Sequence, residues 1–466
     1  MDMRSISPPG RARPHVFPKT QRDPEPFTYF TERNFENITQ VNELPPELRF
    51  DMQVVSSVLP FKVNSYVVNQ LIDWSDIPDD PIFQLTFPQK GMLTEDHFNR
   101  MAALLKNDAP RKDIKEEANR IRLELNPHPA GQTTLNVPTL DGEVLPGLQH
   151  KYRETVLFFP AAGQTCHSYC TFCFRWAQFV GMSDLRFAAK EASQLKEYIR
   201  RHPEVTNVLF TGGDPMVMKT HKLEQYVEPL LDPALEHLQT IRFGTKSMAY
   251  WPQRFVNDPD ADDLLRMFER IIASGRSVAV MAHYNHHREL ETSLAREAVR
   301  RIRDTGAVIR SQSPVLAHIN DSAGVWELMW REQVRLGIIP YYMFVERDTG
   351  AEHYFKIPLV KATKIFREAF RHVNGLARTV RGPSMSATPG KVEVTGMSEV
   401  NGEKVLALRF LQGRNPDWVG RPFFAKYDEE ASWLHHLKPA FGQEKFFFED
   451  ELARMTDEKM KEVDAA

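Results

Sequence analysis

The three cysteines of the chain, Cys166, Cys170 and Cys173, lie within eight positions. An odd, tightly clustered set is a poor basis for disulfides and is typical of a reducing compartment. The spacing lets one loop surround a [4Fe–4S] cluster, which normally takes four thiolates. Because the chain has no fourth cysteine, one iron would stay open and reactive. The alternatives are a structural zinc ion with His167 as fourth ligand, and three unrelated buried cysteines.

A glycine pair follows further along the chain. Gly212, Gly213 and Asp214 stand at the end of the segment 207–212, which is predicted to be a strand. Glycines here would let the backbone approach a ligand closely. Taken alone, the same residues could form only a tight turn between a strand and a helix.

The elements that must position these motifs alternate between strand and helix. The predicted strands are 155–159, 207–212, 238–244, 277–283, 307–311 and 338–344. Helical periodicity marks the segments between them, at 188–201, 222–231, 260–274, 289–305 and 323–337. Such alternation implies βαβ units and a parallel sheet. The sequence therefore predicts an α/β fold, with a partial or full barrel favoured over an open two-sided sheet.

Composition divides the rest of the chain. We expect an extended N-terminal arm over 1–45, a mainly helical region over 46–150, the α/β barrel over 151–345 and a C-terminal region over 346–466. The last part should contain a hairpin around 400–402, a loop before it, and an aromatic cluster at 446–448 that ties down the C-terminal end.

Charge and hydropathy exclude several classes of protein. The 466 residues are 42% hydrophobic and 26% charged, with a net charge of −3. This balance argues against a dedicated nucleic-acid binder, and no apolar run is long enough for a membrane span. No signal peptide is recognisable, so we expect a cytoplasmic protein.

The cysteine motif, with Phe172 before its last cysteine and the Gly-Gly-Asp-Pro segment downstream, resembles the radical S-adenosylmethionine (SAM) superfamily. Further short motifs occur in an order that resembles the lysine 2,3-aminomutase family over about residues 140–395. They are Cys-Phe-Arg at 173–175, Trp-Pro-Gln-Arg at 251–254, His-Tyr-Asn-His at 283–286, Ser-Gln-Ser at 311–313, Ile-Asn-Asp at 319–321 and Pro-Tyr-Tyr at 340–342.

The resemblance implies a partial (β/α)6 barrel with a C-terminal extension, and it assigns cofactors. The three cysteines would hold the [4Fe–4S] cluster. Gly212, Gly213, Asp214 and Gln312 would bind SAM. Pyridoxal 5′-phosphate (PLP) would be carried by Lys391, in the loop Ser-Ala-Thr-Pro-Gly-Lys at 386–391, with Tyr152 and Arg153 beside it. This loop holds less glycine than the family's.

The resemblance also suggests substrate contacts. Arg175 would bind the α-carboxylate, because a guanidinium fits a carboxylate with two parallel bonds. The family's lysine enzymes hold the substrate ammonium with two aspartates. In this chain the position of the first aspartate is occupied by Arg347, or by Asp348 if the alignment shifts by one residue. The position of the second is occupied by Ser384. Lysine is therefore not favoured, and glutamate or another amino acid is open.

The implied reaction is that of an isomerase: an aminomutase that moves the α-amino group of an amino acid to its β-carbon. We expect a small amino acid as substrate, an external electron donor, a homo-oligomer, and neither nucleic acid nor membrane as partner. The family's C-terminal zinc is not expected, since its cysteines are missing. Two other functions are open: a radical SAM enzyme that modifies a lysine on a partner protein, and a non-catalytic Fe–S or zinc-binding protein.

Overall fold

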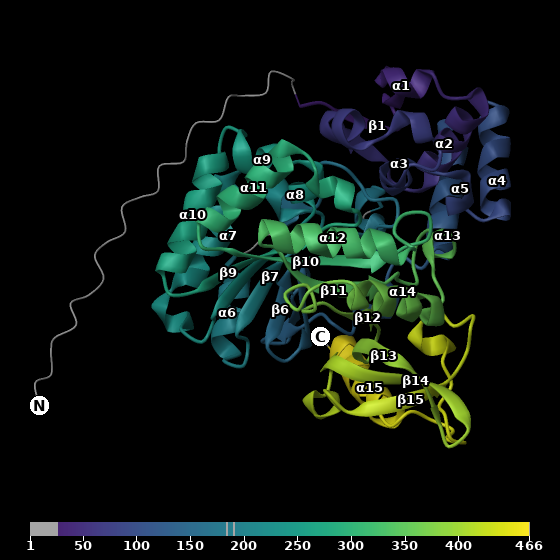
Figure 1. Ribbon diagram of the computed structural model, residues 1–466. Helices are drawn as coiled ribbons and strands as arrows, with labels where there is room; N and C mark the ends of the chain where they lie inside the picture. Colours follow the sequence, from purple (N-terminus) through teal and green to yellow (C-terminus); the bar gives the residue numbers. More distant parts are fainter. Residues whose placement is uncertain (1–26, 183–184, 190–191, 466) are drawn as a thin grey trace, which may run out of the picture.

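A large mixed sheet organises the molecule. The computed structural model describes residues 27–182, 185–189 and 192–465 (Figure 1). Eleven strands form this sheet in the order β15-β14-β13-β12-β11-β10-β9-β8-β7-β6-β5. Seven of them run parallel: β6 (Thr155–Phe158), β7 (Asn207–Phe210), β8 (Thr240–Thr245), β9 (Ser277–His283), β10 (Val308–Val315), β11 (Ile339–Val345) and β12 (Arg381–Ser386). The α/β fold and all six predicted strands are confirmed.

Helices cross between the parallel strands, as their sequence periodicity predicts. They are α6 (Ala192–Arg201), α7 (Thr220–Val227), α10 (Ala261–Ala273), α11 (Ser293–Asp304), α12 (Ala323–Leu336) and α14 (Leu359–Arg371). Short helices α8 (Ser247–Tyr250), α9 (Gln253–Val256) and α13 (Glu352–Phe355) lie between longer elements. Helix α7 ends earlier than predicted, and a 3-10 turn over Glu228–Leu231 contains Pro229, which lacks the backbone N–H of an α-helix.

Antiparallel strands stand at both ends of the sheet. Strand β5 (Leu148–Tyr152) pairs with β6, while β13 (Gly390–Val400), β14 (Glu403–Gly413) and β15 (Pro422–Lys426) follow β12. The predicted hairpin is present, and its turn residues Asn401 and Gly402 both have positive φ, as a two-residue turn requires. The predicted loop before it is wrong over Arg381–Ser386, which is strand β12.

The two ends of the sheet come close together, so the sheet is curled. Strand β14 contacts β5. The Lys151 ammonium on β5 donates to the carbonyl of Ala387, between β12 and β13. Arg414, which follows β14, donates to the carbonyl of Leu135 at 3.3 Å and to the side chain of Asn136. Residues nearly 300 positions apart therefore meet at one seam.

The N-terminal region packs against this sheet. It contains α1 (Thr39–Asn42), α2 (Pro46–Val58), α3 (Pro81–Thr86), α4 (Glu95–Lys106) and α5 (Arg111–Glu124). Two small antiparallel sheets lie beside them: β1 (Tyr29–Thr31) pairs with β2 (Lys62–Asn64), and β3 (Thr139–Leu140) with β4 (Glu143–Val144). Of the predicted extended arm, residues 1–26 lie outside the described residues. The segment 29–42 instead forms β1 and α1 and buries Phe35 and Val41. The domain boundaries stay a prediction.

Two large hydrophobic clusters stabilise the molecule. The first joins the N-terminal helices to the parallel strands, from Phe35 to Val380. The second lies under β13–β15 and includes Phe446 and Phe448, whose rings pack against Phe423. The predicted aromatic cluster is thus confirmed, and the charged helix α15 (Glu449–Ala465) follows it (Figure 1). Within the described residues, no helix has the length and apolar character needed to cross a bilayer.

Candidate functional site

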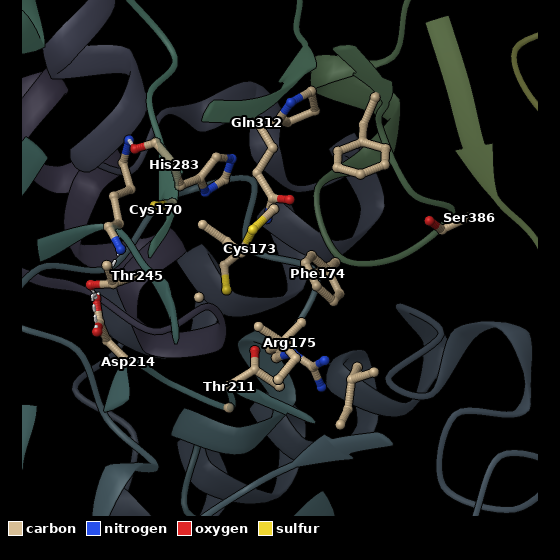
Figure 2. A pocket seen from close by; sticks show the side chains of 18 of the residues that line it. Cys170, Cys173, Phe174, Arg175, Thr211, Asp214, Thr245, His283, Gln312 and Ser386 are labelled. Carbon is tan, nitrogen blue, oxygen red and sulfur yellow. Dashed lines mark hydrogen bonds between the residues drawn. The ribbon is translucent and has the colours of Figure 1, made fainter. Parts of the chain in front are cut away.

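One cavity of about 350 Å³ lies at the carboxyl ends of the parallel strands. Side chains at alternate positions of a strand share one face, so each strand end contributes a few residues. The contributors include Leu209, Thr211, Gly244, Thr245, Met281, His283, Gln312, Pro314, Tyr342, Phe344 and Ser386. Figure 2 shows Cys170 and Cys173 between Gln312 and His283 on one side and Arg175 and Thr211 on the other.

The cysteine loop lies between β6 and α6 and forms one wall of this cavity. All three cysteines line the cavity and are free thiols. Backbone bonds to distant segments hold the loop: Tyr169 N donates to Lys62 O at 2.8 Å, and Thr171 N to Leu85 O at 2.9 Å. The loop is therefore placed by the N-terminal region rather than by its own sequence.

The thiols fit a metal cluster by their chemistry. Burial raises the pKa of Cys170 to about 12 and that of Cys173 to about 11. Thiolates would thus form here only opposite a strong positive charge, which bound iron provides. Within the described part of the chain, no three His, Cys, Asp or Glu side chains gather as the ligands of one metal ion would. A [4Fe–4S] cluster suits this arrangement because each thiolate binds a different iron.

The glycine pair is needed by the cysteine loop itself. A Cβ on Gly213 would lie 2.4 Å from the backbone nitrogen and oxygen of Thr165, just before Cys166. A Cβ on Gly212, whose φ is +134°, would lie 2.2 Å from the Gln164 amide nitrogen. Both glycines line the cavity. Close approach of the backbone is confirmed as their property, and the partner seen here is the cysteine loop.

Asp214 also lines the cavity, but its carboxylate is engaged within the chain. It accepts hydrogen bonds from the Thr245 hydroxyl at 2.7 Å, from Met216 N and Lys246 N at 2.9 Å, and from Ser247 N at 3.1 Å. These bonds join the loop after β7 to the start of α8. The contacts in this structure give Asp214 a positioning role, whereas the resemblance implied a direct bond to SAM.

Lys391 lines the cavity on the side opposite the α8 loop, as the second residue of strand β13. It pairs across the hairpin with Ser386, so the expectation of a flexible loop lysine is wrong. Its Nζ lies 3.1 Å from Gln412 Oε1 and 4.0 Å from the ring centroid of Tyr342. Burial, together with the charges of Arg242 and Arg381, lowers its pKa to about 7.

Of the other two residues predicted beside PLP, one lines the cavity and one does not. Tyr152 lines the cavity, and its ring centroid is 6.0 Å from the Lys391 amine. The prediction that Arg153 lies beside PLP is wrong. Its side chain is 60% exposed and pairs with Glu154 at 3.4 Å, outside the cavity. Strand β5 ends at Tyr152, and Arg153 lies in the turn before β6, where the chain leaves the wall of the cavity. The cations that do line the cavity near Lys391 are Lys151 and Arg242.

Two arginines, one buried and one half-buried, lie beside one aromatic ring. The guanidinium carbons of Arg175 and Arg347 lie 4.9 Å and 5.1 Å from the ring centroid of Phe174. Burial lowers the pKa of Arg175 to about 9, with Arg347 contributing. The Nε of Arg347 is buried and has no hydrogen-bond partner among the described residues. The pair concentrates positive charge at one end of the cavity.

The remaining predicted substrate residues lie elsewhere. Of Arg347 and Asp348, only Arg347 lines the cavity, and the Asp348 carbonyl accepts from Asn126. Ser384 is fully buried in β12, and its hydroxyl donates to Met343 O at 3.4 Å. Ser386, two residues further on the same face, lines the cavity instead. Asp348 and Ser384 are therefore removed from the candidate substrate contacts.

Several lining residues were given no role in the sequence analysis, although His283 and Tyr342 belong to motifs quoted there. They are His283, Glu346, Gln412, Lys246, Tyr250 and Tyr342. His283 ends a predicted strand, so its position at a carboxyl end was an available signal. Gln412 carries no such signal, because β14 reaches the cavity only through the curl of the sheet. Tyr250 lies on α8, a short helix after the carboxyl end of β8 that the sequence analysis did not predict.

Known proteins resemble this chain over most of its length. A protein of Aquifex aeolicus (strain VF5), provisionally named L-lysine 2,3-aminomutase, is 31% identical over 394 residues, which is 84% of this chain and 92% of that protein. The L-lysine 2,3-aminomutase of Fusobacterium nucleatum is 28% identical over 321 residues, 68% of this chain and 69% of that protein.

Other comparisons add less. No family model matches the chain. A radical SAM methyltransferase from Sphaerobacter thermophilus is 15% identical, covers 48% of this chain and 66% of its own, and has a TM-score of 0.35, which is too low to carry an argument. From the extent and identity of the first match, the chain belongs to the lysine 2,3-aminomutase family of radical SAM proteins.

Proposed function

We propose that the chain is a radical SAM, PLP-dependent amino acid 2,3-aminomutase, an isomerase that turns an α-amino acid into a β-amino acid. The observation that carries the proposal is one cavity lined by three thiols, a buried lysine of lowered pKa and an arginine free to bind a carboxylate. We further infer that the curled sheet is the partial (β/α)6 barrel of the radical SAM fold.

The cofactors would divide the cavity between them. Cys166, Cys170 and Cys173 would hold the [4Fe–4S] cluster, and Gln312 with the Gly212–Gly213 backbone would contact SAM. Bound there, the cluster and SAM would supply the radical chemistry that removes hydrogen, and PLP would supply the group that holds the migrating nitrogen. The chain orients these groups and excludes water.

Lys391 suits the attachment of PLP. An amine of pKa about 7 has a substantial neutral, nucleophilic fraction near pH 7, whereas an ordinary lysine has almost none. The ring centroids of Tyr152 and Tyr342 lie 6.0 Å and 4.0 Å from the Lys391 nitrogen. Lys151 and Arg242 would then stand in for Arg153 as the cations nearest to the phosphate.

We propose that the substrate carries an acidic side chain. Arg175 would bind the α-carboxylate and Arg347, whose Nε has no hydrogen-bond partner among the described residues, the second carboxylate, since guanidinium groups attract anions and repel an ammonium. Burial raises the pKa of the neighbouring Glu346 well above its ordinary value, which favours its neutral form beside Arg347. Glutamate fits this description and lysine does not.

The test is product analysis with the reconstituted protein. Anaerobic chain loaded with iron, sulfide, SAM and PLP is incubated with a strong reductant and a panel of L-amino acids. We expect β-glutamate from L-glutamate and far less product from L-lysine. Arg347→Gln should lower kcat/KM for glutamate about 100-fold, the loss of one buried charge-assisted pair.

Arg153→Gln is the matched control, since this arginine is adjacent in sequence to Tyr152 but exposed. It should leave glutamate turnover unchanged. A protein that cleaves SAM and binds PLP but converts no free amino acid contradicts the proposal, and modification of a lysine on a partner protein would then be tested. The homo-oligomer and the external electron donor stay predictions.

A further inference from the structure

Tyr250, at the end of α8, places an unused hydroxyl beside one of the candidate cluster ligands. The residue is 1% exposed and lines the cavity. Its hydroxyl interacts with the Cys170 sulfur, but the contact falls short of a well-formed hydrogen bond. No other described group satisfies this hydroxyl. A buried hydroxyl without a partner is unfavourable, so its presence needs an explanation.

The chain holds Tyr250 firmly in this place. The side-chain amide of Asn64, itself fully buried, donates to the Tyr250 carbonyl at 2.8 Å. The Lys246 ammonium lies 4.3 Å from the Tyr250 ring centroid and is fixed by Glu289 at 2.7 Å and Asn285 at 2.8 Å. A cation over the ring draws electron density from it and makes the hydroxyl a better donor.

We propose that the Tyr250 hydroxyl donates a hydrogen bond to the Cys170 sulfur when that sulfur is a thiolate ligand of the cluster, and that this bond raises the cluster's reduction potential. The inference rests on the proposed function, which supplies the cluster. A thiolate is a stronger acceptor than a thiol, because it carries charge. A donor to a ligand sulfur favours the more negative, reduced cluster, and such bonds are known determinants of cluster potentials. Tyr250 is a positioning and tuning residue in this view, since it touches a ligand and not the reacting atoms.

The test compares two tyrosine-to-phenylalanine variants. Tyr250→Phe removes only the hydroxyl and should fold normally, because no described group depends on that hydroxyl. Tyr284→Phe is the matched control: Tyr284 is also fully buried with an unpartnered hydroxyl, but it does not line the cavity. Each protein is reconstituted anaerobically, and its cluster is titrated between the oxidised and reduced states by EPR and absorbance, without substrate.

We expect the Tyr250→Phe cluster to be harder to reduce. At a fixed solution potential its ratio of reduced to oxidised cluster should fall about tenfold, the effect of one hydrogen bond to a charged acceptor. Tyr284→Phe should match the wild type. An unchanged titration of Tyr250→Phe overturns the inference, and so does an equal shift in both variants. A wild-type chain that takes up no [4Fe–4S] cluster overturns the proposed function as well, which separates the two failures.

Discussion

At the scale of single residues, burial gives Lys391 its chemistry. Its pKa is lowered from 10.5 to about 7, so the neutral, nucleophilic fraction grows as the pH rises through 7 rather than through 10. We predict that the rate at which the cluster-free protein captures PLP follows this midpoint. Borohydride trapping of the PLP adduct, followed by mass spectrometry of the labelled peptide, measures the rate as a function of pH.

The matched control is Lys391→Ala, in which the labelled peptide at 391 should disappear. Lys151 offers an internal comparison, since it is also buried but donates to the carbonyl of Ala387. Capture that reaches its midpoint near pH 10, or labelling that moves to Lys151, would contradict the assignment.

At the scale of elements, the loop after β7 and the cysteine loop are packed backbone against backbone. Gly213→Ala would place a Cβ 2.4 Å from Thr165, so one of the two loops must move. We predict a loss of about 1–3 kcal/mol in the free energy of unfolding and a several-fold lower iron content after reconstitution. Denaturant unfolding and iron analysis measure these two effects.

Gly244→Ala is the control for this change. Gly244 also lines the cavity, on the neighbouring strand β8, but the nearest atom to an added Cβ is 3.6 Å away. Its variant should keep its iron. Equal losses of stability and iron in both variants would show that any added methyl group disturbs the cavity. The close packing of Gly213 against Thr165 would then not be the cause.

At the scale of the whole molecule, the seam between the two ends of the sheet closes the cavity. Arg414 bridges it by donating to Thr388 O at 2.8 Å and Leu135 O at 3.3 Å. Arg414→Met would leave these carbonyls without their donor. We predict a lower melting temperature and weaker PLP binding, measured by PLP absorbance, with normal iron content because the cysteine loop is held from the other side.

Arg421→Met controls for loss of a positive charge from the C-terminal strands. Arg421 is exposed and lies 4.0 Å over the ring of Phe447. It should bind PLP normally. If Arg414→Met loses iron and PLP together, the seam supports the whole sheet rather than its C-terminal end.

The sequence alone predicted the chemistry of the cysteine loop and most of the sheet. Three cysteines within eight residues, and strands that alternate with helices, are local patterns. Such patterns survive in any tertiary context, because ligand spacing and side-chain periodicity depend on residues close together in the chain. The six strands were found for this reason.

Only the tertiary structure decided which side chains face the cavity. Arg347 lines it and Asp348 does not, Arg153 is exposed, and Lys391 lies on a strand. Tyr250 meets Cys170 across 80 positions. These facts depend on the curl of the sheet and on where each strand ends, since Arg153 and Arg347 lie in the segments that follow β5 and β11. Residue types thus indicated the chemistry, and long-range packing selected the side chains that can perform it.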